Sequence, residues 1–300
     1  MRLLIVTGVA LLLLGSSPLL VKANLNPRQA RKLISRMPGF ELSSSAVRVK
    51  GIELRSRSSA EASVDIELAF RLGKNEHGSW DLGDIRTGPN QWEQIEIVLQ
   101  AIKVGERNVE CNPAGSFDRK RGVSEPSVKR AKCLIAGLLG VDGESETIRI
   151  KEITLLSLPL GRPAALVLAV VQADIRFVND PPSGWKVTEM RLGRSEWTNL
   201  QQVIDKVDQM KSEKAKADLE MIAKALEKLH ADRGFYVASD KQGVLMDFLS
   251  PAYLPRILRI DPWHRPYLYQ GGPNQFKLRS AGPDGKEDTA DDIVIDSSSQ

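Results

Sequence analysis

The sequence has few of the residues on which enzymes and metal proteins most often depend. Only three histidines, His77, His230 and His264, and two cysteines, Cys111 and Cys133, occur among its 300 residues. It contains no Gly-x-Ser-x-Gly, P-loop or His-Glu-x-x-His motif. Because catalysis needs a base, a nucleophile or an open metal position, we do not expect an enzyme. The formal net charge of +4 is too small to indicate nucleic-acid binding.

The N-terminus carries a short apolar run. LLIVTGVALLLLG is followed by SSPLLVKAN, with Val21 and Ala23 where a signal peptidase requires small residues. This pattern predicts a signal peptide of residues 1–23, cleaved after Ala23, and a periplasmic or secreted protein of net charge 40 − 38 = +2 with no stable membrane span. The alternative is an uncleaved anchor, since Leu3 to Val21 could just span a bilayer. No cysteine follows the run, which argues against a lipid-anchored lipoprotein.

Two parts of the chain match each other, which indicates an internal repeat. AVRVKGIEL (46–54) matches TIRIKEITL (147–155) at an offset of 101 residues. FRLGKNEHGSWDLGDIRTGPNQWEQI (70–95) matches IRFVNDPPSGWKVTEMRLGRSEWTNL (175–200) at an offset of 105. The offset changes in a loop between the matched blocks, where insertions are tolerated. We therefore predict two copies of one module, a first repeat (24–104) and a second repeat (129–208), joined by a basic linker (105–128).

Each repeat has the same order of predicted elements. A short helical pattern precedes an alternating strand, a longer strand, a turn and a third strand, and a helical stretch closes the copy. Such a unit belongs to the α+β class, with an antiparallel sheet and a helix against one face. In pattern it resembles the curved-sheet cystatin and nuclear-transport-factor-2-like group. The predicted fold is therefore two tandem helix-plus-antiparallel-sheet modules, followed by a third α+β domain.

The two cysteines flank the basic linker. Export favours a disulfide between Cys111 and Cys133, which would constrain an otherwise irregular connection. The alternative is two unpaired thiols. A metal site is not expected, because no other Cys and no His is near them in the sequence.

The matched blocks share tryptophans and arginines: Trp80 with Trp185, Trp92 with Trp197, and Arg86 with Arg191. In one interpretation the tryptophans line a groove in which the two arginines bind an anion. In the other, each tryptophan fills the core and each arginine pairs with the acid two positions before it, Asp84 or Glu189. The second interpretation is favoured, since a shared core would be repeated in any case.

Near the C-terminus, the stretch LRSAGPDGKEDTADDIV (278–294) is crowded with carboxylates. Five acidic residues lie between positions 284 and 292, opposed only by Lys286: Asp284, Glu287, Asp288, Asp291 and Asp292. Such carboxylates repel one another unless a cation lies among them, and Ca²⁺ accepts six to eight oxygens in irregular geometry. Gly282 and Gly285 allow the backbone to bend, so that carbonyls can also face inward. The alternative is a solvated acidic turn without an ion.

The final domain, residues 209–300, resembles a known family. An amphipathic helix ends near DRGFYVAS and is followed by DPWHRPYLYQ (261–270) and by FKLRSAGPDG…ADDI (276–293). With these motifs, the stretch 214–296 resembles the periplasmic domain of the major pseudopilin, protein G, of type II secretion systems. That family binds calcium in the last loop. The resemblance therefore implies Ca²⁺ held by the side chains of Asp284, Asp291 and Asp292 and by the backbone carbonyls of Leu278 and Ser280.

The sequence also departs from that family. A pseudopilin has a prepilin leader and a Gly-Phe-Thr-Leu-x-Glu motif at the head of a long apolar helix, and this sequence contains neither. The stretch before the C-terminal helix, LQQVIDKVDQMKSEK, is polar. We therefore do not expect assembly into a pseudopilus by the family's mechanism.

These observations predict an exported, non-catalytic, calcium-binding protein. It would be a scaffold or accessory component of a cell-envelope assembly such as type II secretion, with envelope proteins, among them the secretion machinery, as partners. The alternative is a periplasmic module whose repeats hold a small apolar or anionic ligand. A cavity of several hundred Å³ would favour the ligand, whereas a filled core with an apolar outer patch would favour a protein partner.

Overall fold

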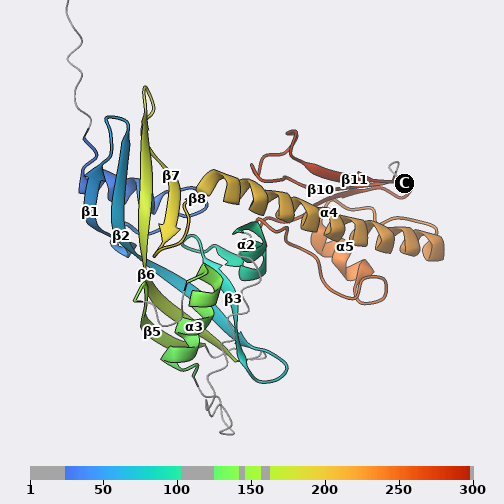
Figure 1. Ribbon diagram of the computed structural model, residues 1–300. Helices are drawn as coiled ribbons and strands as arrows, with labels where there is room; N and C mark the ends of the chain where they lie inside the picture. Colours follow the sequence, from blue (N-terminus) through green and yellow to red (C-terminus); the bar gives the residue numbers. More distant parts are fainter. Residues whose placement is uncertain (1–23, 103–124, 142–145, 157–162, 298–300) are drawn as a thin grey trace, which may run out of the picture.

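The structure is a computed structural model that describes residues 24–102, 125–141, 146–156 and 163–297. A large twisted sheet with helices on one face is joined by a long helix to a smaller C-terminal domain (Figure 1). The chain is thus a mixture of helices and antiparallel strands, as predicted. The predicted signal peptide and Cys111 lie outside the described residues.

The elements of the large sheet occur in the same order in the two halves of this region. The first half contains α1 (Pro27–Ser35), η1 (Ser44–Ala46), β1 (Val47–Leu54), β2 (Ser59–Lys74), β3 (Trp80–Arg86), β4 (Trp92–Gln94) and α2 (Ile95–Ile102). The second contains α3 (Val128–Leu139), β5 (Ile148–Leu156), β6 (Ala164–Asp180), β7 (Gly184–Leu192), β8 (Thr198–Asn199) and α4 (Leu200–Arg233). Side chains cap the helices in both halves, Asn26 at α1, Ser127 at α3 and Asn199 at α4.

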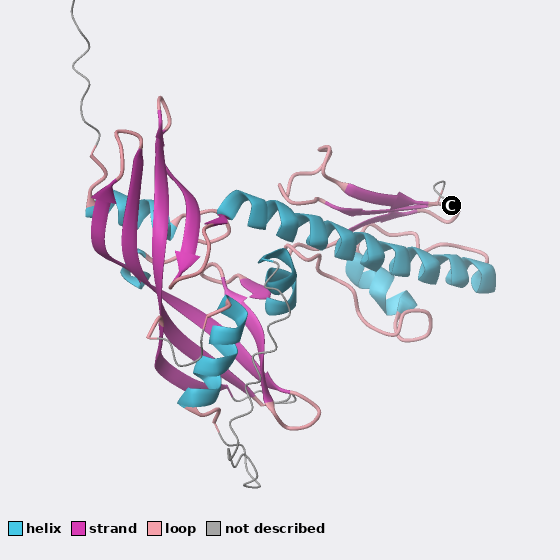
Figure 2. Ribbon diagram, in the orientation of Figure 1, coloured by secondary structure: helices cyan, strands magenta, loops and turns pink. Residues whose placement is uncertain are grey.

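The strands of both halves form one sheet, in which β2 and β6 pair antiparallel along nearly their whole lengths. The order is β4-β3-β2-β6-β7-β8, with β1 also on β2 and β5 also on β6. Each end of the sheet therefore mixes strands from the two halves (Figure 2). At the centre Ile66 pairs with Val171, which lies 105 positions later in the chain.

One face of this sheet is apolar and covered by helices. Alternate residues of β2 and β6 are buried there, which is the period expected of strands with one buried face. Ile34 of α1 and Ile135 of α3 are fully buried in the same core. The opposite face carries charged side chains, so the alternation along each strand decides which face is packed.

The helix α4 connects the sheet to the C-terminal domain. Its first turns contribute Leu200 to the core of the sheet, and its later turns contribute Leu219, Ile222 and Leu226 to a second core. The helix is continuous across position 209, where the sequence places the start of the last domain. Around it lie α5 (Gln242–Leu249) and an antiparallel sheet in the order β11-β10-β9, made of β9 (Leu268–Gly271), β10 (Phe276–Ser280) and β11 (Ile293–Asp296). Within the described residues, no helix has the length and apolar character needed to cross a membrane.

Candidate functional site

The Asp-Pro-Trp motif of the C-terminal domain forms a turn organised by one buried carboxylate. Asp261 Oδ1 accepts hydrogen bonds from the backbone amides of Trp263 and Arg265, each at 2.9 Å. Asp261 Oδ2 accepts from the hydroxyl of Ser280 at 2.7 Å, which ties the turn to the end of β10. His264 lies in this turn with a φ of 66°, in the left-handed region. Because the Asp261 carboxylate is fully used by these donors, its role here is structural.

Two further contacts fix this turn and the following strand to α4. The indole Nε1 of Trp263 donates to Asp208 Oδ1 at 2.9 Å. The hydroxyl of Tyr267 donates to Asp218 Oδ2 at 3.2 Å, and Arg256 pairs with the other oxygen of Asp218 at 2.7 Å. Burial, together with the Asp218 carboxylate, raises the pKa of Tyr267, so this hydroxyl stays protonated and can donate. The motif is thereby held on the same helix that enters the large sheet.

The acidic loop after β10 is organised by its own backbone. The amide of Asp284 donates to Asp291 Oδ2 at 2.9 Å, and the amide of Asp288 donates to Asp292 Oδ2 at 2.9 Å. The hydroxyl of Thr289 lies 2.6 Å from Asp291 Oδ1 and 3.4 Å from Asp284 Oδ1, so these two carboxylates converge on one group. The hydrogen bonds from Asp284 N and Thr289 outweigh burial and hold the pKa of Asp291 below its ordinary value.

Two arginines outside the acidic segment 284–292 reach this loop, and neither contact was expected from the sequence. Arg279 Nη1 lies 2.8 Å from Asp288 Oδ1 and 3.5 Å from Asp292 Oδ2. Arg265 donates to the carbonyl oxygen of Gly282. Lys286 is therefore not the only cation among the carboxylates. The alternation of residues along β10 could have indicated that Arg279 is available for such a contact, because it places this side chain on the face opposite the buried Leu278 and Ser280.

The acidic loop carries the negative charge that a hard cation such as Ca²⁺ requires, but only some of its oxygen atoms lie where they could bind one. Asp292 Oδ1 is buried and has no hydrogen-bond partner among the described residues, so it is an oxygen left for a ligand. Within the same part of the chain, no three Asp, Glu, His or Cys side chains are grouped as a metal site. A cation here would therefore need carbonyl oxygens in addition to Asp284, Asp291 and Asp292. The side chains of Leu278 and Ser280 are buried, so only their backbone carbonyls could serve.

The repeated tryptophans occupy two kinds of environment. Trp80 is fully buried in the core, and Trp185 packs partly buried against it. Trp92 lies under the guanidinium of Arg71, with the Cζ atom 4.4 Å from the ring centroid. Trp197 lies under Arg176 at 4.0 Å. The tryptophans therefore do not line a common groove.

The expected pairing of each repeated arginine with the acid two positions before it is wrong. Asp84 pairs with Arg71 at 3.1 Å and Glu189 pairs with Arg176, both across neighbouring strands. Arg191 pairs with Asp174 at 3.0 Å, also across strands. The physical reason is that side chains opposite each other on adjacent antiparallel strands lie closer than residues two apart in one strand.

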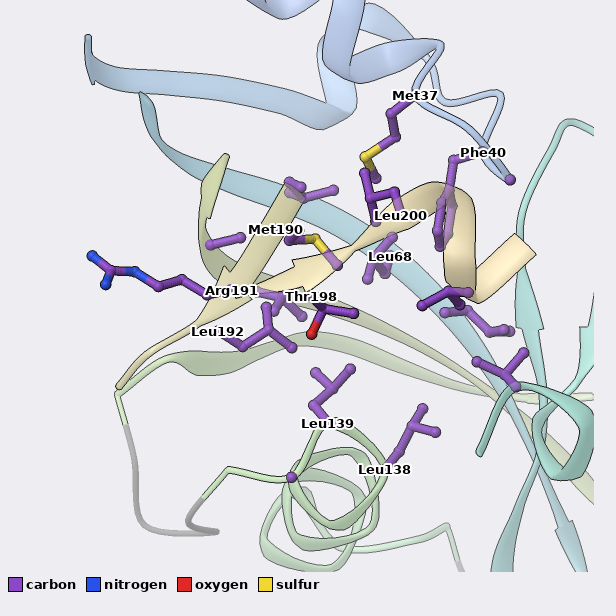
Figure 3. A pocket seen from close by; sticks show the side chains of 18 of the residues that line it. Met37, Phe40, Leu68, Leu138, Leu139, Met190, Arg191, Leu192, Thr198 and Leu200 are labelled. Carbon is purple, nitrogen blue, oxygen red and sulfur yellow. The ribbon is translucent and has the colours of Figure 1, made fainter. Parts of the chain in front are cut away.

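A cavity of about 1340 Å³ lies on the apolar face of the large sheet (Figure 3). It is bounded by the loop after α1, the end of α3, the β7–β8 turn and the first three turns of α4. Most of its wall is apolar, as with Met37, Phe40, Leu68, Leu139, Met190 and Leu192. No local sequence pattern predicts this cavity, because its walls come from segments that are far apart in the chain.

The remaining candidate residues lie apart from one another. His77 is exposed in the β2–β3 turn, and His230 stacks on Tyr236 with ring centroids 4.3 Å apart. Cys133 is half-buried on α3, and because Cys111 lies outside the described residues the disulfide stays a prediction. The backbone amide of His264 donates to the carbonyl oxygen of Asp261 at 2.9 Å, so this histidine belongs to the Asp-Pro-Trp turn.

Comparison with known proteins concerns the C-terminal part of the chain. Residues 202–297 match the family described as type II secretion system, protein G. The type II secretion system core protein G of Pseudomonas aeruginosa is 35% identical over 103 residues, which cover 30% of this chain and 72% of that protein. No solved structure matches the chain.

Proposed function

Since this chain belongs, through its C-terminal domain, to the type II secretion system protein G family, we propose that it is an exported accessory component of a cell-envelope assembly. It would act in the periplasm or outside the cell, by contact with secretion-machinery proteins rather than by catalysis. The observation that carries this proposal is the family match over residues 202–297, which spans nearly all of α4 and the whole of the small sheet.

Exposed apolar side chains on the C-terminal domain support a contact role. Phe248 is 47% exposed on α5, Ile257 and Ile260 are each 59% exposed on the loop that follows, and Val294 is 41% exposed on β11. Contiguous exposed apolar patches mark sites of protein contact, and these side chains are the candidates for such a patch on this domain. In addition, the carboxylates of the domain accept hydrogen bonds from loop amides and pair with arginines, and these contacts stabilise the fold.

The partner proposal is tested by capture from an envelope extract of a cell that has a type II system. The intact chain should retain identified secretion-system proteins, and the chain with Phe248→Ser and Ile257→Ser should retain fewer of them. Leu54→Ser serves as the control, because Leu54 is 48% exposed but lies on the large sheet. Equal recovery by the intact chain and by beads without protein would contradict the proposal.

We also propose that the acidic loop binds calcium. The supporting observations are the convergence of Asp284 and Asp291 on Thr289, the unpaired oxygen of Asp292, and the calcium site that the family resemblance implies. Bound Ca²⁺ would supply positive charge that Arg279 and Arg265 supply only in part. The protein residues would fix the loop against β10, and metal binding to the folded state alone would stabilise that state.

Thermal unfolding with and without a chelator tests this site. In excess calcium the wild type should melt several degrees higher than in chelator, and Asp291→Ala combined with Asp292→Ala should melt at the same temperature in both. Glu287→Ala is the matched control, since Glu287 is a 60% exposed acid of the same loop outside the ligand set, and it should keep the calcium response. Superimposable wild-type curves would show that Arg279 and Arg265 neutralise the loop without a metal.

We further propose that the two halves of the large sheet are copies of one module. Strand pairing is irregular between Val49 and Gly51 in β1 and between Ile150 and Glu152 in β5, at the sequence offset of 101. It is irregular again beside Arg71 in β2 and beside Arg176 in β6, at the offset of 105. Bulges are specific local features, so their recurrence at both sequence offsets supports duplication.

A small-ligand module is the second candidate function, and the cavity favours it. The volume of this cavity, about 1340 Å³, is large enough to hold a small molecule, for which sites of about 300–1000 Å³ are usual. The two functions are compatible, because the cavity and the acidic loop lie on different parts of the chain.

A further inference from the structure

The cavity lies where the two halves of the large sheet meet. Ile66 and Val171, the pair at the centre of the β2–β6 ladder, both line it. Ile85 and Met190, which are also 105 positions apart, form another matched part of the wall. The cavity is therefore built by both halves together, and neither half alone would enclose it.

The charged groups of the cavity wall, apart from those on the exposed β7–β8 turn, already have partners. Lys211, whose side chain is 5% exposed, pairs with Glu93 at 2.7 Å. Asp208 accepts from the indole of Trp263. Arg191 extends away from the cavity in Figure 3 and pairs with Asp174. A charged ligand group deep in the cavity would have to break one of these pairs, so the buried part of a ligand should be uncharged.

The charged residues at the mouth of the cavity favour neither an anionic nor a cationic head group. Arg194 and Glu196 are both exposed on the β7–β8 turn, and they carry opposite charges. Their charges cancel at a distance, so an anion and a cation at the mouth would gain little. Selectivity should therefore depend on the buried part of the ligand.

The wall chemistry favours a hydrocarbon chain over a peptide. A peptide would bring backbone amides and carbonyls into the cavity, and each would need a hydrogen-bond partner there. The wall is formed mainly by apolar side chains on the face of the sheet and on the helices, and its hydroxyl groups, those of Thr87, Thr147, Ser195 and Thr198, are too few to satisfy a peptide backbone. A hydrocarbon chain has no polar groups to satisfy, and the two flexible methionines can adapt to its shape.

We propose that this cavity binds the aliphatic chain of a single-chain amphiphile, a fatty acid or a lysolipid, with its head group at the Arg194–Glu196 rim. This proposal rests on the small-ligand module named above as the second function. Affinity is set by chain length, and head-group charge has little effect.

The test uses the full chain and an uncharged fluorescent probe of apolar sites, N-phenyl-1-naphthylamine. Dodecanol, dodecanoate and dodecyl lysophosphatidylcholine should each displace it, with affinities that agree within about threefold. Shortening the alcohol should weaken displacement roughly fourfold per methylene, as expected from about 0.8 kcal/mol for each buried CH₂. If only the lysolipid displaces the probe weakly, the ligand is a fatty acid or a similar chain without a phospholipid head group, and the proposal stands in that narrower form.

Two substitutions of Leu by Trp separate the cavity from general surface binding. Leu139→Trp places a ring in the cavity and should weaken dodecanol binding at least about tenfold, whereas Leu54→Trp, at an exposed site on β1, should not change it. Val203→Phe, at another lining position, in α4, gives the same test should Leu139→Trp unfold, and circular dichroism checks each fold. Unchanged binding in a folded cavity variant overturns the proposal.

The outcomes of this test also distinguish the amphiphile proposal from the broader proposal of a small-ligand module. If one head-group charge binds more than about tenfold better than the others, chain-driven binding is wrong, but a small-ligand module remains. If neither the probe nor any amphiphile binds, both the ligand class and the small-ligand module are rejected.

Discussion

The two halves of the large sheet place an arginine over a tryptophan at matching positions, but they surround it differently. In the first half Arg71 covers Trp92 and pairs with one carboxylate, Asp84. In the second half Arg176 covers Trp197 and pairs with two carboxylates, Glu189 and Glu61. The side chain of Arg176 is correspondingly less exposed, at 30% against 41% for Arg71.

The difference arises from the pairing of β2 with β6. Across this ladder Arg176 faces Glu61, whereas Arg71 faces Leu166, the counterpart of Glu61 in the second half. The backbone arrangement is thus matched, while one side chain decides whether a second ion pair forms. The fold therefore constrains the residues on the apolar face of this sheet strongly and those on the charged face weakly.

The largest effect should come from breaking the matched core positions, Trp80 and Trp185. Trp80→Ala should lower the free energy of unfolding by about 3–5 kcal/mol, because a fully buried ring leaves a cavity that the core cannot close. Trp185→Ala should cost clearly less, since Trp185 is only partly buried. Urea unfolding followed by circular dichroism measures both. Equal losses would mean that the halves bury these positions alike in solution.

Strand positions were largely predictable, while the joining of the halves into one sheet was not. The stretch 47–54 was predicted as a strand and is β1, because alternation alone fixes a strand with one buried face. The pairing of Ser59 with Val178 joins residues far apart in sequence, and no local pattern encodes it. Similarly, the helical stretch that closes the second repeat and the amphipathic helix of the last domain form one continuous helix, α4, whose polar first turns are helical through packing on the sheet.

The C-terminal motifs were predictable as a family resemblance, but their contacts were not. The resemblance identified DPWHRPYLYQ, yet nothing in the sequence shows that Asp261 receives the hydroxyl of Ser280. Likewise, Arg279 reaches Asp288 and Asp292 only because β10 and the following loop fold back on each other. Long-range polar contacts depend on tertiary structure, which sequence spacing does not define.

A smaller effect should distinguish the two arginines. Arg176→Ala should lower the free energy of unfolding by about 1–2 kcal/mol, because it leaves the partly buried carboxylate of Glu189 without its charged hydrogen-bond donor and leaves Glu61 with Arg55 alone. Arg71→Ala should cost less than about 1 kcal/mol, as is usual for a single exposed ion pair. Chemical unfolding at neutral pH gives both values. If Leu166→Glu then makes the Arg71→Ala loss larger, the missing second carboxylate explains the difference; an unchanged loss would reject that cause.

The smallest effect is a pH dependence of the ion pairs around Arg176, where Glu61 of the first half is the second carboxylate that Arg71 lacks. Burial by itself would raise the pKa of Glu61, but hydrogen bonds from Arg55 and Arg176 outweigh it and lower the pKa below its ordinary value of 4.5. A lowered carboxyl pKa contributes stability that is complete above 4.5 and is lost as the pH falls through the folded-state pKa. The stability difference between wild type and Glu61→Gln, less than about 1 kcal/mol at neutral pH, should therefore shrink below about pH 4. Glu53→Gln, at a more exposed partner of Arg55, should show a weaker trend, and a Glu61→Gln difference that stays constant with pH would exclude the ion pair as its source.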